Sequence, residues 1–328
     1  MARAFLTGGS GFIGGKLIER LVADGHEVRA LARSEGSARK VAAHGAEPVM
    51  GDLTDRAALH TGAEGCEVTY HAAAKVGDWG PWSEFLRDTV EGTRTVIEAS
   101  AAAGVPRLVH VSTEAVLIAG EPLVNVDERK PRRPDSRAYY PRSKAMAEEI
   151  AVNASRDGFE TVVVRPRFVW GAGDETLLPE LAGMVKSGRF AWIGGGRHRT
   201  DVTHVDNVVH GMRLAAEKGG VGEIYFLTDD EPVGFREFVS EMLATQGIDP
   251  PERSMPVPVA RALAAGGETA WRVLHLKGAP PLTRFAYWVS SQECTINIAK
   301  AKQELGYEPV RTRADGMEEL RAAPAEVS

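Results

Sequence analysis

The stretch Thr7-Gly-Gly-Ser-Gly-Phe-Ile-Gly14 decides the fold that we expect for this chain. It follows a short apolar run at residues 3–7 and opens a segment, residues 12–24, whose apolar side chains recur at helical spacing. Glycines at this spacing suit a tight turn, a close approach of the backbone to a pyrophosphate and close packing of helix on strand. Because a helix N-terminus attracts anions, this strand–turn–helix context predicts a dinucleotide-binding loop. The loop residues that we expect to contact the cofactor are Gly8, Ser10, Gly11, Phe12, Ile13 and Gly14.

The rest of the first half alternates between short apolar runs and helix-like segments. The runs with the length and composition of strands are residues 27–32, 46–50, 68–71, 108–111 and 162–165. Helical periodicity is seen over residues 83–103 and 141–154. Strands that alternate with helices predict an α/β fold, a Rossmann-type doubly wound parallel sheet with helices on both faces.

The regular alternation of strands and helices ends after Gly171, where clusters of glycine and proline interrupt the chain. We therefore expect two domains. A dinucleotide-binding domain is expected at residues 1–175 and a smaller substrate-binding domain at residues 176–328. A segment near residues 204–216 is expected to pack back on the first domain.

The composition is that of an ordinary globular protein. Lysine plus arginine number 39 and aspartate plus glutamate 45, a formal charge of −6, and no basic block stands out. Cys66 and Cys294 lie far apart and make neither a disulfide framework nor a metal cluster, so we expect no metal. No apolar run reaches the ~18 residues that indicate a membrane span, and the N-terminus lacks a signal-peptide pattern. We therefore expect a cytoplasmic protein that binds no nucleic acid.

The end of the second predicted strand indicates which dinucleotide binds. An acidic residue at this position would hold the ribose hydroxyl groups of NAD, but the chain has Ala32, followed by Arg33. Arg33 can pair with a 2′-phosphate and stack on adenine, and Lys40 adds positive charge, so we expect NADP rather than NAD. Asp52, after the third strand, is placed to accept a hydrogen bond from the adenine amine. Two simpler interpretations stay open, in which Arg33 is a solvated surface residue and Asp52 caps the following helix.

Tyr140 and Lys144 stand four residues apart and therefore on one face of the predicted helix. A neighbouring ammonium group favours the phenolate, so we expect Lys144 to lower the pKa of Tyr140 below its usual ~10. Such a tyrosine can exchange a proton with a substrate oxygen near neutral pH. Tyr139 has no lysine at the same distance. A hydroxyl group on Ser112 or Thr113, at the end of the fifth predicted strand, would hold the substrate oxygen, although either hydroxyl group could instead cap a turn.

These motifs, taken in their order along the chain, resemble a known family. They are TGGSGFIG at residues 7–14, GDL at 51–53, HAAA at 71–74, VST at 111–113, YPRSK at 140–144, RPRFVWG at 165–171, HVDNVVHG at 204–211 and LGYEP at 305–309. The chain resembles extended short-chain dehydrogenases/reductases, the NAD(P)-dependent epimerase/dehydratase group. Within that group it is similar to the 3β-hydroxysteroid dehydrogenase and dihydroflavonol reductase branch, over nearly the whole chain.

The resemblance implies a role for each matching residue. Thr113 corresponds to the catalytic Ser/Thr, Tyr140 to the acid/base, and Lys144 to the lysine that binds the nicotinamide ribose and lowers the tyrosine pKa. Thr89 departs from the pattern, because the family often has asparagine at this position. The residues after the glycine-rich loop that the resemblance places beside the cofactor are Leu53, Ala72, Ala73, Ala74, Tyr140, Lys144, Pro166 and Val169.

Two substrate classes compete within this group. One is a bulky, apolar secondary alcohol or ketone, as in hydroxysteroid dehydrogenases and dihydroflavonol-type reductases, and the other is a nucleotide sugar, as in epimerases and dehydratases. The 4,6-dehydratases have two adjacent acids after the catalytic threonine, whereas Glu114 is followed here by Ala115. Thr200 stands where sugar-nucleotide enzymes often have an arginine for the diphosphate. Both features weigh against a nucleotide sugar.

The C-terminal part favours a lipophilic substrate. Residues 255–289 are rich in large apolar side chains and either line an apolar pocket, lie on a membrane surface or form ordinary core. The run Pro280-Pro-Leu-Thr283 resembles a segment of 3β-hydroxysteroid dehydrogenases, which favours a steroid-like substrate. Members of the group are often homodimers, the assembly expected here. A role limited to redox sensing would be typical of a chain that has lost Tyr140 or Lys144, and both are present.

Overall fold

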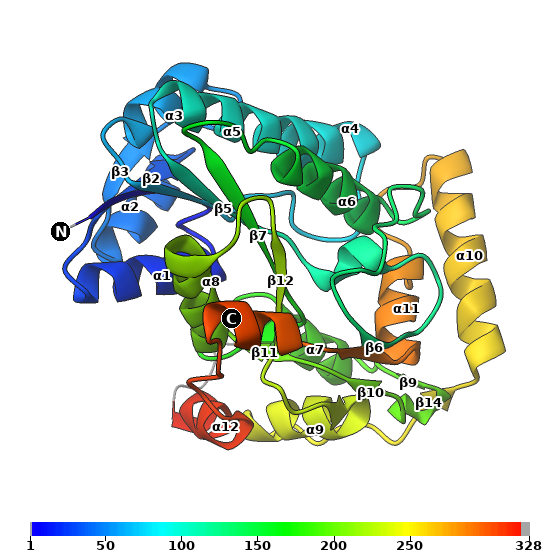
Figure 1. Ribbon diagram of the computed structural model, residues 1–328. Coiled ribbons are helices and arrows are strands. Elements are labelled where there is room, and N and C mark those ends of the chain that lie inside the picture. The colour runs from blue at the N-terminus through cyan, green and yellow to red at the C-terminus, as the bar shows by residue number, and fades with distance from the viewer. Residues whose placement is uncertain (1, 323–328) are drawn as a thin grey trace.

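The computed structural model of the protein describes residues 2–322. Its centre is a seven-stranded parallel sheet in the order β12-β7-β5-β4-β1-β2-β3 (Figure 1). The strands are β1 (Arg3–Thr7), β2 (Glu27–Ala32), β3 (Glu47–Met50), β4 (Val68–His71), β5 (Arg107–Val111), β7 (Glu160–Pro166) and β12 (Ile224–Leu227). The expected doubly wound parallel sheet is confirmed, and the first six of these strands match the predicted runs to within two residues.

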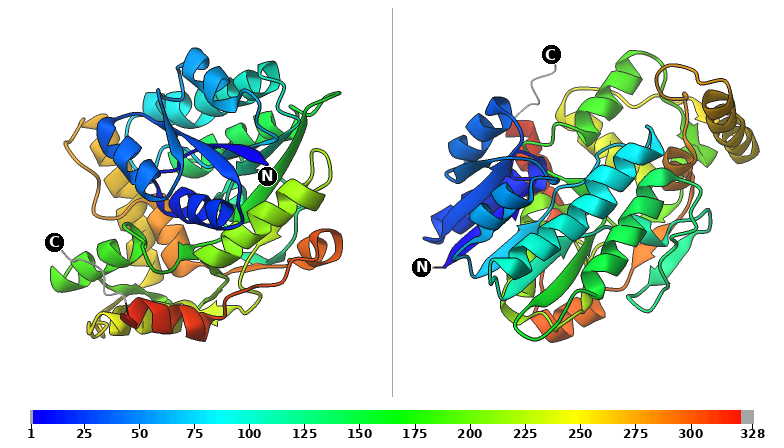
Figure 2. Two further views of the ribbon diagram at one scale, coloured as in Figure 1. Left: turned by 90° about the vertical axis from the view of Figure 1, so that its left-hand side faces the viewer. Right: turned by 90° about the horizontal axis from the view of Figure 1, so that it is seen from above.

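Helices cover both faces of the sheet (Figures 1 and 2). One face carries α1 (Phe12–Ala23), α2 (Glu35–Ala43) and α8 (Val205–Lys218), and the other carries α3 (Arg56–Ala63), α5 (Gly92–Ala102) and α6 (Tyr139–Val152). Successive strand residues point to opposite faces, so Phe5 packs in the core beneath α3 and α5 while Leu6 packs beneath α1. Burial on both faces explains why these strands are almost continuously apolar.

The helix expected over residues 83–103 is divided into three parts. They are α4 (Trp82–Phe85), the π-helical segment η1 (Leu86–Glu91) and α5. Thr89 lies in η1, and its hydroxyl group accepts a hydrogen bond from the backbone of Lys75 at 3.1 Å. This residue therefore fastens the loop after β4 to the helix.

The strand order reverses beside β1, which pairs with β2 on one side and β4 on the other. Ligands of such sheets bind in the crevice at the carboxyl ends of the strands, at this switch point. The expected functional residues follow these ends, after Thr7 of β1, Ala32 of β2, His71 of β4 and Val111 of β5. The topology therefore brings motifs from distant parts of the chain to one edge of the sheet.

Segments outside the large sheet, most of them in the second half of the chain, form smaller sheets and a second group of helices. A four-stranded sheet has the order β13-β10-β15-β6, and β11 pairs with β8 and β14 with β9. These strands are β6 (Leu123–Val126), β8 (Val169–Trp170), β9 (Trp192–Ile193), β10 (Arg199–Thr200), β11 (Thr203–His204), β13 (Val233–Gly234), β14 (Ser254–Met255) and β15 (Cys294–Ile296). The helices are α7 (Leu177–Lys186), α9 (Phe235–Thr245), α10 (Val257–Val273), α11 (Arg284–Ser291) and α12 (Arg313–Ala322), with short helical turns η2 (Glu114–Leu117), η3 (Gly194–Gly196) and η4 (Ala301–Leu305).

Two segments of this later part return to the large sheet. α8 packs on α1 and β7, and β12 pairs in parallel with β7. β12 was not among the predicted strands, because a run of four residues carries little periodicity of its own. The division at residue 175 therefore does not separate the strands of the large sheet from the rest, and the two-domain organisation stays a prediction.

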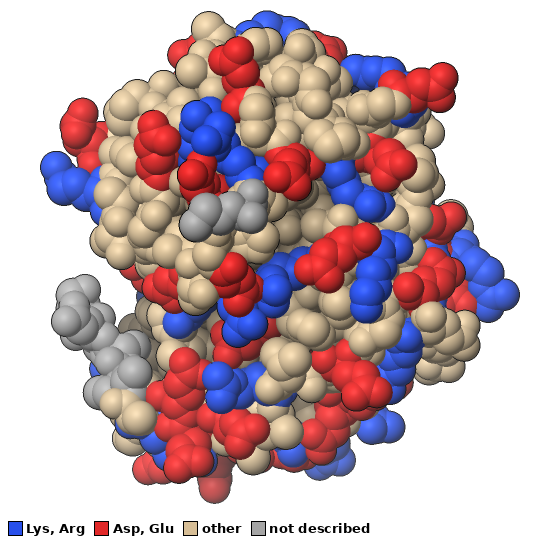
Figure 3. Space-filling model, turned by 60° about the vertical axis from the view of Figure 1, so that its left-hand side comes forward, with Lys and Arg blue, Asp and Glu red and all other residues tan. Residues whose placement is uncertain are grey.

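The surface carries no obvious signature of a polyanion partner on the face drawn in Figure 3, where lysine and arginine alternate with aspartate and glutamate. Among the helices of residues 2–322, none has both the length and the apolar character needed to cross a bilayer.

Candidate active site

The glycine-rich loop joins β1 to α1, and its backbone requires glycine at two positions. Gly8 has φ of +85°, and a Cβ there would lie 2.7 Å from the backbone nitrogen of Ala73. A Cβ on Gly14 would lie 2.2 Å from the carbonyl oxygen of Gly8, so α1 starts in direct contact with the loop. Gly11 precedes α1 and offers no side-chain cap, which leaves the first N–H groups of the helix in need of an acceptor. The loop therefore fits the pyrophosphate of a dinucleotide.

Arg33 and Lys40, both expected near the adenosine phosphate, are in different situations. Arg33 follows β2 and is exposed, and no residue in the described part of the chain forms a hydrogen bond or an ion pair with it. Lys40 instead forms an ion pair with Glu175, with a distance of 2.9 Å from Nζ to Oε2. The side chains of Lys40 and Glu175 are 51% and 75% exposed, so this ion pair is solvated and Lys40 stays a candidate beside the unpaired Arg33.

Asp52 lies at the end of β3 in a tight turn. Its Oδ1 accepts hydrogen bonds from the backbone and the hydroxyl group of Thr54, at 2.8 and 2.6 Å, which lowers the pKa of Asp52. The cap of α3 is Asp55, whose side chain accepts from Ala58, so the alternative role of Asp52 as the helix cap is wrong. Asp52 therefore stays a candidate for the adenine contact.

The other expected cofactor residues surround the loop. Ala72, Ala73 and Ala74 follow β4 beside Gly8, and Pro166 ends β7. The remaining ones are Ser10 and Ile13 near the start of α1, Leu53 after β3 and Val169 in β8. All of them lie in or near the segments that follow the carboxyl ends of the strands, where the cofactor crevice is expected.

Thr113, Tyr140 and Lys144 meet at the carboxyl end of β5. Tyr140 is half-buried in the first turn of α6, and its side chain lies next to the hydroxyl group of Thr113. Lys144, one turn later, donates from Nζ to the carbonyl oxygen of Val111 at 2.7 Å. Phe285 of α11 closes the other side, with its ring centroid 5.3 Å from that of Tyr140. A hydroxyl group, a phenol and an ammonium group thus converge beside an aromatic wall.

Tyr139 points elsewhere. Its ring lies 5.1 Å from that of Trp82, and the guanidinium group of Arg272 stacks on it at 3.9 Å. The tyrosine that reaches Thr113 is therefore Tyr140, as its lysine partner indicated.

Burial governs the protonation of this group. It raises the pKa of Tyr140 to about 12, the Glu114 carboxylate adds to the rise, and the hydrogen bond with Thr113 opposes it. Burial also lowers the pKa of Lys144 to about 8, against the charge of Glu148. The expected lowering of the Tyr140 pKa by Lys144 stays a prediction, since in the chain by itself burial and Glu114 raise this pKa and Lys144 is not among the groups that shift it. Tyr140 is a phenol near neutral pH, the form that donates a proton.

A buried ion pair next to Thr113 was not predicted from the sequence. Glu114 pairs through Oε1 with Arg167, and the two side chains are only 4% and 2% exposed. The hydroxyl group of Thr113 donates to the other carboxylate oxygen of Glu114 at 2.7 Å. Arg167 also donates to the hydroxyl group of Thr200 at 3.1 Å. An arginine within the apolar run of RPRFVWG was a signal, because a buried guanidinium group requires an acidic partner.

A second missed pair fixes α6 on the sheet. Arg165 of β7 donates to both carboxylate oxygens of Glu148 on α6, at 2.8 and 2.6 Å. Ser112 donates to the same carboxylate at 2.6 Å. Ser112 is therefore a structural partner of Glu148, and Thr113 is the hydroxyl residue that faces Tyr140. Glu148 lies one turn after Lys144 and keeps negative charge near its ammonium group.

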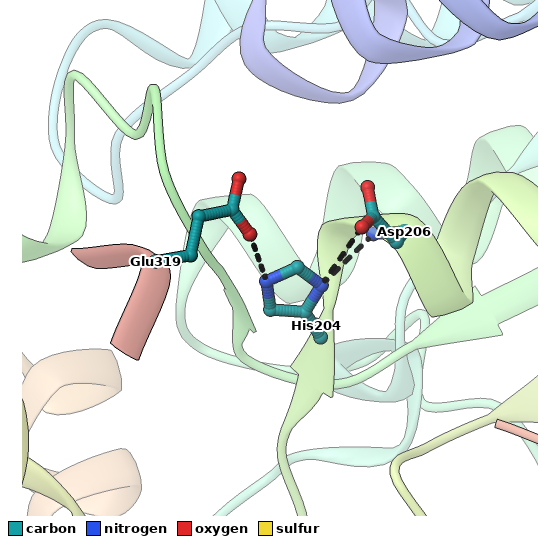
Figure 4. A group of neighbouring side chains, drawn as sticks. All are labelled: His204, Asp206 and Glu319. Atoms are coloured by element: carbon teal, nitrogen blue, oxygen red, sulfur yellow. Dashed lines mark hydrogen bonds and ion pairs between the residues drawn. The ribbon is translucent and has the colours of Figure 1, made fainter. Parts of the chain in front are cut away.

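His204, Asp206 and Glu319 form a cluster at the start of α8 (Figure 4). The buried imidazole lies between the two acids, with Nδ1 3.8 Å from Asp206 and Nε2 3.7 Å from Glu319. Nδ1 also accepts a hydrogen bond from the backbone of Asp206 and so caps α8. The two acids flank opposite nitrogens of the ring. The imidazole ring would therefore separate a cation bound to one nitrogen from the carboxylate that lies beside the other nitrogen. The cluster ties α12 to α8.

The fold and this site define a dehydrogenase/reductase of the extended short-chain type that uses a nicotinamide cofactor. Residues 5–257 match the 3-beta hydroxysteroid dehydrogenase/isomerase family, and the chain belongs to this family.

Three relatives align over almost their full length. The chain is 47% identical to the 4-hydroxy-2-methyl-3-oxo-4-farnesyl-3,4-dihydroquinoline-1-oxide ketoreductase of Stigmatella aurantiaca, over 98% of this chain and 96% of the relative. It is 35% identical to the decarboxylating sterol-4-alpha-carboxylate 3-dehydrogenase of Dictyostelium discoideum, over 98% and 100%. It is 34% identical to the 2-alkyl-3-oxoalkanoate reductase of Stenotrophomonas maltophilia, over 98% and 99%.

Solved structures agree on the fold. The crystal structure of gox2253 has a TM-score of 0.80 and 27% identity, and covers 99% of both chains. The dTDP-glucose 4,6-dehydratase of Streptomyces venezuelae, solved with NAD, has a TM-score of 0.77 over 99% of this chain and 97% of that one. At 24% identity, this second likeness concerns the fold alone.

Proposed function

We propose that this chain reduces a keto group on a bulky, apolar molecule to a secondary alcohol, with NADPH as the reductant. The observation that carries the proposal is the neighbouring pair of Thr113 and Tyr140, with Lys144 one turn away and the Phe285 ring against Tyr140. The direction of reduction is supported by two of the relatives, which are named as a ketoreductase and a reductase.

Each residue would have a distinct task. When bound, the nicotinamide cofactor supplies hydride to the carbonyl carbon. Tyr140 donates its phenolic proton to the carbonyl oxygen, and Thr113 positions that oxygen by a hydrogen bond. Lys144 holds positive charge beneath them, supported by Glu148, and is the group expected to bind the nicotinamide ribose. The glycine-rich loop and the start of α1 would hold the pyrophosphate.

An apolar substrate is favoured over a nucleotide sugar. Phe285 gives the reaction site an aromatic wall. The expected diphosphate position is occupied by Thr200, an uncharged side chain that is fully buried and accepts a hydrogen bond from Arg167. A diphosphate would therefore find no cation at this position. The relatives are named for a farnesylated quinoline oxide, a sterol carboxylate and 2-alkyl-3-oxoalkanoates. A 3β-hydroxysteroid-like ring system and a prenylated or alkylated ketone both belong to the proposed class, as does a dihydroflavonol-like ketone.

The choice of NADP rests on Ala32 and on the unpaired Arg33 at the end of β2. The expected homodimer and cytoplasmic location are kept as parts of the proposal. Light scattering of the purified protein would test the dimer directly.

The test is nicotinamide absorbance with purified protein and a panel of ketones, each with NADPH and NADH. The panel contains a 3-ketosteroid, a 2-alkyl-3-oxoalkanoate, a farnesylated quinoline ketone and a dTDP-4-keto sugar. We expect turnover with at least one of the first three, faster with NADPH, and a loss of about a hundredfold or more in the Tyr140→Phe variant, which keeps its cofactor affinity. Turnover of the keto sugar alone, or full activity in Tyr140→Phe, would refute the proposal.

A further inference from the structure

A cavity of about 450 Å³ lies where α10 packs on α11, two helices that run side by side in Figure 1. In each helix an arginine is followed by lining residues three and four positions later, which places them on one face. They are Arg261, Ala264 and Ala265 in α10 and Arg284, Tyr287 and Trp288 in α11. A cavity of this volume fits a small organic molecule.

The polar side chains at this cavity include donors without a partner. Arg137, in the loop before α6, and Arg261 have neither a hydrogen bond nor an ion pair within residues 2–322. Tyr287 and Trp288 are only 6% and 8% exposed, and in the described chain the phenol and the indole N–H also lack a hydrogen bond. Buried polar groups are as a rule hydrogen-bonded, so these side chains are available to a ligand that accepts hydrogen bonds.

The charge at the cavity is positive. Arg284 also lines it, but Glu268 accepts hydrogen bonds from its backbone at 2.7 Å and from its guanidinium group, so this charge is balanced. Among the residues that the structure describes, no aspartate or glutamate lines the cavity. Arg137 and Arg261 therefore contribute two positive charges that are not compensated, although the whole chain carries −6.

The acids close to Arg137 along the chain have another partner. Asp135 lies 2.9 Å from Arg133, and Glu121 lies 3.5 Å from the same guanidinium group. Both acids are thus held by Arg133, and Arg137 remains unpaired beside them. An anion that enters the cavity meets a free guanidinium group here.

The rest of the wall is apolar and firmly held. Ala119 and Gly120 line the cavity from the loop after η2. Gln292, which ends α11, donates from Nε2 to the carbonyl oxygen of Gly120 at 2.8 Å. The backbone of Gly120 lies so close to Trp288 that a Cβ there would be 3.3 Å from the indole Nε1. A flat apolar group therefore finds a preformed surface of methyl groups and an indole ring.

We propose that this cavity binds an organic anion, a carboxylate or phosphate group carried on a small apolar body. Arg137 and Arg261 pair with the anionic group, and the alanine side chains and the Trp288 ring contact the apolar body. A neutral molecule would leave both guanidinium charges without a partner. A bare inorganic ion would leave the apolar wall in contact with water. The combination of free cations and an apolar wall therefore favours an organic anion.

The cavity is built by the segments that also carry the reacting groups. Arg137 stands three residues before Tyr140, and Arg284 directly precedes Phe285, whose ring packs on that of Tyr140. A bound anion therefore contacts both sides of the reaction site. It is either an acidic group of the ketone substrate or a separate small molecule. This link rests on the proposed function, whereas the binding itself does not.

Isothermal titration calorimetry of the full chain tests the site without substrate or cofactor. The probes are naphthalene-2-carboxylate and its neutral counterpart, naphthalene-2-carboxamide. The test variant is Arg137→Gln/Arg261→Gln. The matched control is Arg253→Gln/Arg321→Gln, two exposed arginines that have no ion pair within residues 2–322 and lie outside the cavity wall. We expect the carboxylate to bind the wild type and the control, and to bind the test variant more weakly by about tenfold or more.

A further variant separates the cavity from surface charge in general. Ala265→Phe keeps both arginines but places a ring in the cavity, so it should also weaken carboxylate binding by about tenfold or more. Circular dichroism checks that each variant is folded, and if Ala265→Phe is not, the arginine variant decides alone.

Other results would overturn the proposal. They are no binding by the wild type, equal binding of carboxylate and carboxamide, or unchanged binding in Arg137→Gln/Arg261→Gln. Wild-type affinity in a folded Ala265→Phe variant would place the anion outside the cavity. Inorganic phosphate that displaces the carboxylate at equal concentration would show that the apolar wall takes no part.

Initial rates of ketone reduction then identify the source of the anion. If naphthalene-2-carboxylate inhibits competitively with the ketone, the cavity holds an acidic group of the substrate. Any other kinetic effect, or none, assigns the cavity to a separate anion. Calorimetry needs no turnover, so a failure of the proposed function leaves the binding result intact, and the reverse also holds.

Discussion

The buried pair of Glu148 and Arg165 makes a sharp prediction about stability. Both side chains are at most 1% exposed, and they share two hydrogen bonds of 2.8 and 2.6 Å. Arg165→Met keeps the apolar contact with Phe226, on whose ring the guanidinium group lies, but it removes the charge. The carboxylate is then left buried with Ser112 and the more distant Arg132, 3.4 Å away.

Breaking such a pair costs about 3–5 kcal/mol of unfolding free energy. Because Arg132 remains nearby, the lower end of that range is expected here. With an unfolding entropy of about 2.1 cal/mol/K per residue, a chain of 328 residues loses about 4 °C of Tm for ~3 kcal/mol. Thermal unfolding followed by circular dichroism measures this shift.

The pH dependence of Tm shows whether the charges of the pair stabilise the folded chain. Burial alone would raise the pKa of Glu148, but the hydrogen bonds and charge of Arg165 hold it below its usual value. In the wild type the pair therefore stabilises above the unfolded pKa of ~4.3 and is lost as the pH falls through the lowered folded pKa. In Arg165→Met burial is no longer offset, so the pKa of Glu148 rises and protonation relieves the penalty. The Tm gap between wild type and variant should narrow from about pH 7.5 to about pH 5.

Two further variants control this experiment. Arg129→Met breaks an exposed pair, in which the Arg129 side chain is 91% exposed, and should change Tm by less than about 1 °C. The double variant Arg165→Met/Glu148→Leu replaces the pair with apolar groups and should regain most of the lost Tm. A stabilising role of the charged pair is refuted if Arg165→Met has the same Tm as Arg129→Met at neutral pH. It is also refuted if the Tm difference between wild type and Arg165→Met widens as the pH falls.

Three other substitutions test the site. Arg33→Ala should weaken NADPH binding by about tenfold and NADH binding much less, measured by fluorescence titration; equal losses would count against a 2′-phosphate contact. Gly14→Ala should abolish binding of both cofactors while the chain stays folded, because its Cβ would lie 2.2 Å from the carbonyl oxygen of Gly8, and unchanged binding would place the pyrophosphate elsewhere. Phe285→Ala should raise KM for the bulky ketone about tenfold, because it removes ~1.4 kcal/mol of apolar contact, and should leave KM for NADPH unchanged. Initial rates measure both constants. If KM for the ketone does not rise relative to KM for NADPH, Phe285 does not contact the substrate.

Features with a local cause were predictable from the sequence. The glycine-rich loop, the first six strands of the large sheet and the placement of Tyr140 and Lys144 one turn apart on α6 depend on residues within one turn or one strand of each other. Periodicity and glycine spacing record such short-range geometry directly. The order of these motifs along the chain was enough to indicate the dinucleotide-binding fold and the class of chemistry.

Only the tertiary structure decided features whose partners are distant in the chain. β12 is a strand because β7 pairs with it, and Lys40 forms an ion pair with Glu175, 135 residues away. Glu114 and Arg167 meet although they are 53 residues apart in the chain, and packing against distant segments raises the pKa of Tyr140. Burial and charge pairing are properties of the assembled chain, because both depend on which distant segments fold together.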